Sequence, residues 1–126
     1  VNMCTQIVSH LKSIFRQKYD IRRYCDKDPY ENAIEPDIRV TTIISMGAAI
    51  DIPGLRTVIM TNSIDSAQAN IQVLGRLRKL PDRDVRFYYI FCESIPKQVK
   101  YHNNKRMLFN NRCKSHRDFR LPFSLT

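Results

Sequence analysis

Short runs of β-branched and aromatic residues alternate with segments of helical periodicity, and this alternation restricts the fold more than any other feature. The runs Ile38–Ile44, Thr57–Met60 and Val85–Cys92 have the length and composition of β-strands. A helical pattern separates the second run from the third, which is typical of parallel strands joined by a crossover helix. The sequence therefore predicts an α/β fold with an open parallel sheet flanked by helices. Its 126 residues fit one compact domain.

The amino-terminal segments add a helix and another strand to this scheme. Apolar residues recur at helical spacing from Met3 to Phe15, with Asn2 in the position of an N-cap. The segment Tyr19–Tyr24 alternates as a short strand, and the polar stretch 26–36 is a loop with one helical turn. Because no strand precedes the first helix, Val1 and Asn2 are interpreted as the end of a truncated first strand.

The segment after Met60 is predicted to form a second amphipathic helix. Asp65 followed by Gln68 has the pattern of a capping box, and Ala67, Ile71 and Leu74 would face inward.

The carboxyl-terminal third is predicted as a strand, a helix and a tail. The almost continuously apolar run Val85–Cys92 would be a central strand covered on both faces. A basic helix would follow from Pro96 to about Asn111, and the stretch 119–125 would dock weakly or fray. We expect Tyr88, Tyr89 and Phe91 to be core residues rather than base-stacking platforms.

The charge favours a polyanionic partner. The formal net charge is +9, and the stretch from Lys97 to Arg120 holds eight Lys or Arg residues against one acid, Asp118. By itself such a basic stripe favours a solvated helix face, but together with the segments described below it favours nucleic acid. No stretch approaches the roughly 18 apolar residues of a membrane span, and no signal peptide is recognisable.

The four cysteines are widely spaced, which favours reduced thiols in an intracellular protein over a disulfide framework. Cys113 and His116 have a ligand-like spacing, but no second pair completes a tetrahedral zinc site, so no metal centre is predicted.

Two segments carry the candidate chemistry, and both are expected at the carboxyl ends of the strands. In the first, Thr42, Ser45, Gly47 and Asp51 combine small residues, hydroxyls and one carboxylate, which suits contacts with phosphate and ribose. The second, Gln72–Lys79, places a glutamine, a Gly-Arg step and further cations on about two helical turns. A guanidinium in this setting can reach a phosphate whose charge is changing.

The run from Arg39 to Lys79 resembles motifs V and VI of the superfamily 2 helicases, through Asp-Ile-Pro-Gly-Leu-Arg-Thr-Val-Ile and the later Gln-Val-Leu-Gly-Arg-Leu-Arg-Lys. The rest of the chain is similar to the second RecA-like domain of that family, a P-loop NTPase-type fold. The Gly-Arg-Leu-Arg-Lys ending is most similar to DNA helicases of large DNA viruses and phages. The resemblance implies a helicase domain over residues 1–117 with a tail over 118–126.

The resemblance also implies residue roles. Arg76 would be the arginine finger aimed at the γ-phosphate of ATP, and Gln72 would lie near that phosphate and the attacking water. The second cation of motif VI is either Arg78 or Lys79. By role, the implied residues are Arg76 and Gln72 for catalysis, Gly47, Asp51, Gly75, Arg78 and Lys79 for ATP binding, and Asn2, Thr42 and Ser45 for the nucleic-acid backbone.

The phosphate-cradling half of an ATP site is absent from the sequence. It contains no Gly-x-x-x-x-Gly-Lys-Ser/Thr loop and no Asp-Glu-x-His box for Mg²⁺. The chain alone is therefore expected to be inactive. ATP hydrolysis would require an amino-terminal RecA-like domain of the same protein, which would supply most ligands of ATP and Mg²⁺.

The main hypothesis is thus the second motor domain of an ATP-dependent nucleic-acid helicase or translocase, with DNA favoured over RNA. One alternative is a non-catalytic basic α/β module that binds nucleic acid, which leaves Gln72, Gly75 and Arg76 unexplained. Another is a nucleotide-binding or metabolic enzyme without a nucleic-acid partner. The three histidines, His10, His102 and His116, are expected to have no catalytic role.

Overall fold

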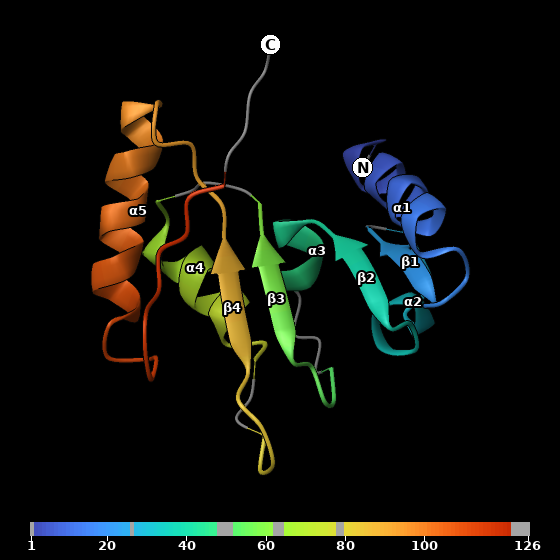
Figure 1. Ribbon diagram of the computed structural model, residues 1–126. Coiled ribbons are helices and arrows are strands. Elements are labelled where there is room, and N and C mark those ends of the chain that lie inside the picture. The colour runs from blue at the N-terminus through green and yellow to red at the C-terminus, as the bar shows by residue number, and fades with distance from the viewer. Residues whose placement is uncertain (1, 26, 48–51, 62–64, 78–79, 122–126) are drawn as a thin grey trace.

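The structure of the chain is a computed structural model that describes residues 2–25, 27–47, 52–61, 65–77 and 80–121. Helices and strands alternate along most of the chain, as Figure 1 shows. In chain order the elements are α1 (Asn2–Phe15), β1 (Ile21–Tyr24), α2 (Glu31–Ile34), β2 (Ile38–Thr41), α3 (Ile43–Gly47), β3 (Thr57–Met60), α4 (Ala67–Leu74), β4 (Arg86–Tyr89) and α5 (Pro96–Phe109).

The described strands form two parallel pairs. β1 pairs with β2 from Ile21 opposite Ile38, and β3 pairs with β4 from Thr57 opposite Arg86. All four arrows in Figure 1 point the same way, in the order β4, β3, β2, β1, and α3 lies between β2 and β3. The α/β class with parallel strands is confirmed. Within the described residues, no hydrogen-bonded ladder joins the two pairs into the single open sheet that the sequence predicted.

Parallel strands give the molecule two edges. We call the edge where the strands end, at Tyr24, Thr41, Met60 and Tyr89, the carboxyl edge, and the opposite edge the amino edge. The chain returns from the carboxyl edge to the amino edge before each new strand begins, because all four strands run in the same direction (Figure 1). The start and the end of a crossover helix therefore lie at opposite edges.

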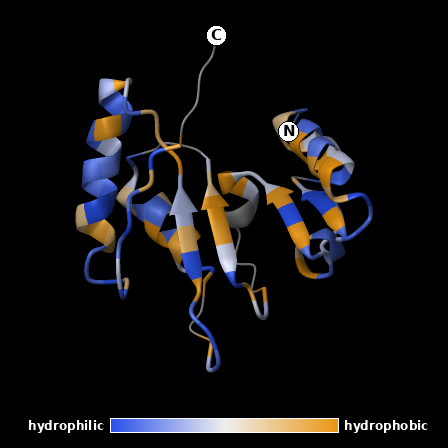
Figure 2. Ribbon diagram, in the orientation of Figure 1, coloured by the Kyte–Doolittle hydropathy of each residue, from blue (hydrophilic) through white to orange (hydrophobic). Residues whose placement is uncertain are grey.

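Each strand pair has its own packed region. Beside β1, Ile21 is buried together with Cys4 of α1 and Cys25. Beside β3 and β4, Met60 and Val73 are buried, and Phe109 of α5 lies edge-on to Phe87, with 5.5 Å between ring centroids. Figure 2 shows β3 mostly hydrophobic and α5 mostly hydrophilic, so α5 docks through a few inward-facing side chains.

Several sequence predictions are confirmed. The first and last helices, the strand Thr57–Met60 and the helical turn inside residues 26–36 all occur. The Pro-Gly turn is also present, since Leu55 N–H donates to Ile52 O at 3.4 Å and Gly54 has φ of +73°. That left-handed conformation is favourable for glycine.

Strand lengths and the first residues were predicted wrongly. The strand from Ile38 ends at Thr41, because α3 begins at Ile43. Asn2 is already helical in α1, so it is neither an N-cap nor part of a truncated strand, and Val1 lies outside the described residues.

The packing of α4 and β4 also differs from the prediction. Ser66 rather than Asp65 caps α4, with its Oγ accepting from Ala69 N–H at 3.2 Å. The inward residues of α4 are Asn70 and Val73, whereas Ala67 is exposed. The predicted strand Val85–Cys92 shortens to β4 and is half-buried at most, so it is not covered on both faces.

The tail beyond α5 is held by ion pairs. Asp118 pairs with Arg106 at 2.8 Å, and Arg120 pairs with Glu93 at 3.1 Å. Residues 118–121 therefore run beside α5 and the end of β4, as Figure 1 shows. Among the described residues, no helix has both the length and the apolar character needed to cross a bilayer.

Candidate nucleotide and nucleic-acid site

The segment Gln72–Arg76 forms the last turn of α4 and the two residues after it. Gln72 is exposed on the helix, and Gly75 N–H donates to Ile71 O at 2.8 Å. A Cβ at position 75 would lie 3.2 Å from the same carbonyl oxygen, which is a tight contact. Arg76 follows in the turn and is half-buried, with its Nε enclosed by the protein. Arg78 and Lys79 lie outside the described residues.

This segment lies at the amino edge, which corrects the prediction that it gathers at the carboxyl ends of the strands. α4 leaves β3 at the carboxyl edge and returns the chain to the start of β4. Figure 1 shows the end of α4 near the level where β4 begins. The topology that makes β3 and β4 parallel therefore carries Arg76 away from the carboxyl edge.

The Pro-Gly turn lies at the same edge as Arg76. Residues Ile52–Leu55 directly precede β3, and Ile52 is buried against Ala33 of α2. Gly54 is exposed there, and a Cβ atom at this position would have no neighbour within 4 Å. Gly47 is the last residue of α3, whereas Asp51 lies outside the described residues. The amino edge thus combines the Pro-Gly turn with the Gln72–Arg76 segment.

Thr42 and Ser45 lie at the carboxyl edge. Ser45 N–H donates to Thr42 Oγ1 at 3.1 Å, and Thr42 Oγ1 lies 3.0 Å from Ser45 Oγ. Thr42 therefore caps α3, and this explains why Ile43 and Ile44 are helical despite their strand propensity. Both hydroxyl residues are half-buried, and they lie side by side where β2 ends.

Asn2 is exposed at the start of α1, which precedes β1 and therefore begins on the carboxyl-edge side (Figure 1). The three residues predicted to contact nucleic acid, Asn2, Thr42 and Ser45, thus lie on the same side of the sheets. Gln72, Gly75 and Arg76 lie on the other side.

A buried histidine and lysine were missed by sequence reasoning. His102 is buried on α5, stacks on Phe91 with 4.1 Å between centroids, and its Nδ1 lies 2.8 Å from the Tyr89 hydroxyl. Burial lowers the pKa of His102 below 6.5. Lys105 is buried as well, with its Nζ 4.9 Å from the centre of the Tyr89 ring, and burial lowers its pKa.

The spacing on α5 carried a signal for this burial. His102, Lys105 and Phe109 recur at intervals of three and four residues, which is the spacing of one helix face. The expectation that Tyr89 and Phe91 belong to the core agrees with their ring contacts to His102. Tyr88 instead shares the other face of β4 with Arg86, whose Nη1 lies 3.3 Å from its hydroxyl.

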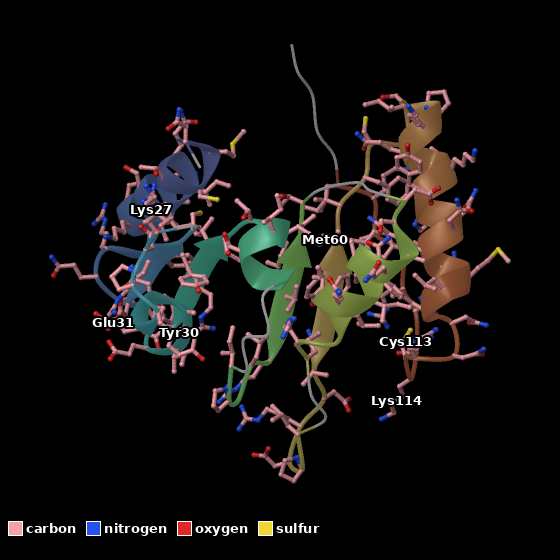
Figure 3. All side chains as sticks on the ribbon, turned by 180° about the vertical axis from the view of Figure 1, so that it is seen from behind. Lys27, Tyr30, Glu31, Met60, Cys113 and Lys114 are labelled. Atoms are coloured by element: carbon pink, nitrogen blue, oxygen red, sulfur yellow. The ribbon has the colours of Figure 1, made fainter. Side chains whose placement is uncertain are left out.

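The four cysteines form no disulfide. Cys4, Cys25, Cys92 and Cys113 are all free. Burial and the neighbouring Cys4 thiol raise the pKa of Cys25 to about 11. Cys113 Sγ lies 3.3 Å from His116 Nε2, so that predicted pair is in contact, and Figure 3 shows Cys113 beyond the end of α5. Within the described residues, no third His, Cys, Asp or Glu joins a group that could hold a metal ion.

Comparison with known proteins adds no relative, since no protein-family model, no curated protein and no solved structure matches this chain.

Proposed function

We propose that this chain is the second, RecA-like motor domain of an ATP-dependent nucleic-acid helicase or translocase, with DNA as its favoured substrate. The observation that carries the proposal is the Gln-x-x-Gly-Arg segment at the end of α4, on the same edge as the Pro-Gly turn before β3. In the resemblance to superfamily 2 helicases, these two segments face the nucleotide together. Thr42 and Ser45 lie at the opposite, carboxyl edge, away from both segments.

The described residues fit half of a nucleotide site. Arg76 supplies a guanidinium at an edge that a second domain can approach, and Gln72 is exposed one helical turn before it. ATP with Mg²⁺, held mainly by an amino-terminal RecA-like domain, would supply the phosphoryl group that is transferred to water. The role of Arg76 is then to neutralise charge that develops on that group in the transition state.

The nucleic-acid side of the proposal rests on backbone contacts. Hydroxyls such as those of Thr42 and Ser45 can donate to phosphate oxygens, which positions a strand without reading its sequence. Closure of the two domains on ATP would bring Arg76 into the site and shift the strand, and opening after hydrolysis would complete a step.

The test uses the polypeptide that joins this chain to its amino-terminal motor domain. Arg76→Ala should lower the kcat of nucleic-acid-stimulated ATP hydrolysis by about 10³-fold or more, while oligonucleotide binding stays near that of the parent. Arg76→Lys should recover little activity, because an ammonium cannot form the paired hydrogen bonds of a guanidinium.

Arg83→Ala is the matched control. Arg83 is another arginine of the amino edge, and it pairs with Asp82 at 3.1 Å on the surface. Its loss should leave kcat unchanged within about twofold, since exposed pairs contribute little. Hydrolysis that survives Arg76→Ala while binding falls would reject the motor function and favour the alternative of a non-catalytic nucleic-acid-binding module.

A further inference from the structure

The first two turns of α5 share an edge with Thr42 and Ser45. β4 ends at Tyr89 on the carboxyl edge, and α5 begins seven positions later at Pro96. Lys97 and Lys100 therefore lie towards the carboxyl edge, and Figure 1 shows α5 starting above the arrowheads of β3 and β4. The later part of α5 descends towards the amino edge, and the tail after it turns back and runs up beside β4 (Figure 1).

Three of the eight basic residues between Lys97 and Arg120 are held in ion pairs. Arg106 pairs with Asp118, Arg120 pairs with Glu93, and Lys114 pairs with Asp84 at 3.7 Å. These pairs leave the basic stripe only partly available to an anionic partner.

Lys97 and Lys100 take no part in these ion pairs. Both are exposed, and no ion pair to either is present within the described residues. The first turn of α5 contains no acid. Lys97 lies in the first turn of α5, where a cation opposes the helix dipole, so this lysine does not serve the stability of α5. The charge of both lysines is available to an anion from outside.

The inner face of α5 fixes the direction in which these lysines point. His102, Lys105 and Phe109 are buried against β4 and its aromatic residues. With about 100° between successive helical residues, Lys97 and Lys100 project away from this buried face. The ammonium groups of Lys97 and Lys100 are therefore exposed to solvent when α5 packs against β4.

We infer that Lys97 and Lys100 of α5 extend the nucleic-acid surface of Thr42 and Ser45 along the carboxyl edge, where they bind backbone phosphates of a single strand. This inference rests on the proposed function in taking nucleic acid as the partner. The strand would be gripped at two places on one edge: hydrogen-bonding hydroxyls at the end of β2 and cations at the start of α5. Both contacts read the backbone rather than the bases.

The experiment measures binding of a fluorescent oligo-dT to the 126-residue chain by anisotropy, without ATP, over a range of salt concentrations. Lys97→Glu/Lys100→Glu is compared with Lys18→Glu/Lys114→Glu, which changes the net charge equally. Lys18 lies between α1 and β1 in the sequence, and Figure 3 shows Lys114 beyond the end of α5. Both lysines are exposed. Lys97→Gln/Lys100→Gln tests the same site without charge reversal, and circular dichroism checks that each variant is folded.

The α5 variants should weaken binding on the order of tenfold at about 50 mM salt and should reduce the slope of log K against log salt by about 1.4, for two lost phosphate contacts. The control pair should change affinity by less than about twofold. Equal losses in both pairs would reject the inference and indicate non-specific charge attraction. Polyglutamate that displaces the oligo-dT at equal charge concentration would also overturn it, in favour of an acidic polypeptide partner.

The outcome is separate from that of the ATPase test. If Arg76→Ala leaves hydrolysis intact but oligo-dT binding depends on Lys97 and Lys100, the motor proposal fails and the α5 surface stands. If the α5 variants bind normally while Arg76→Ala abolishes hydrolysis, the surface is rejected and the motor remains.

Discussion

Lowering the pH from about 7.5 to about 5.5 should destabilise the chain through His102. The imidazole is 9% exposed and contacts Phe91 and the Tyr89 hydroxyl. Burial is the largest cause of its lowered pKa; the nearby Asp118 opposes that effect, and Arg106 and Lys105 add to it. The folded chain therefore keeps His102 neutral at a pH where an unfolded chain binds a proton.

The sign and the size follow from proton linkage. Above the unfolded pKa of about 6.5, neither state binds the proton and the contribution of His102 to stability is fully present. As the pH falls below 6.5, the unfolded state binds more protons, so the free energy of unfolding decreases until the folded pKa is reached. One proton over one pH unit corresponds to at most about 1.4 kcal/mol at pH 5.5. The expected change in Tm is a fall of a few degrees.

Thermal unfolding followed by circular dichroism at several pH values measures the effect. His102→Gln removes the titrating group and should flatten the dependence, whereas His10→Gln, at an exposed position of α1, should leave it unchanged. Asp28 and Asp82 do not interfere, because their pKa values are lowered below 3.8 and the stability they provide is lost only at lower pH. An undiminished pH slope in His102→Gln, or an NMR titration of His102 at or above 6.5, would refute the reasoning.

Two further changes probe the packing around α4 and α5. Phe109→Ala should lower the free energy of unfolding in urea by about 3–5 kcal/mol, because the ring is 3% exposed and packs edge-on against Phe87; a loss below about 1 kcal/mol would contradict this docking. Ser66→Ala should cost about 1 kcal/mol by removing the N-cap of α4, and Asp65→Ala should cost less. A larger loss of stability in Asp65→Ala than in Ser66→Ala would indicate that Asp65 is the N-cap instead.

Local patterns predicted most elements well where periodicity was clean. The strand Thr57–Met60 has the predicted bounds, and α1 and α5 deviate from prediction by one or two residues. The error at Ile43 and Ile44 has a specific cause. Their β-branched side chains favour a strand, but the Thr42 hydroxyl accepts from Ser45 N–H and begins a helix one residue after β2 ends. A side-chain cap of this kind outweighs a weak propensity.

The candidate site was predicted less well for two different reasons. The edge of Arg76 could have been derived from the sequence, since a crossover helix between parallel strands must end where the next strand begins. The burial of His102 and Lys105 could not be derived as easily. Polar and charged residues on the inward face conceal the apolar periodicity of α5. That face is buried against the aromatic residues of β4, Phe91 and α4, which its own sequence does not reveal.

The two edges also suggest how the proposed motor would couple its two ligands. α3 begins beside the end of β2, where Thr42 and Ser45 lie, and the chain after it reaches the Pro-Gly turn at the amino edge before β3. α3 also contacts α4, whose end carries Gln72 and Arg76. On the proposed function, α3 and its contact with α4 thus connect the strand contacts with the helix that carries the arginine. Coupling of hydrolysis to translocation would require these contacts to change together when ATP binds.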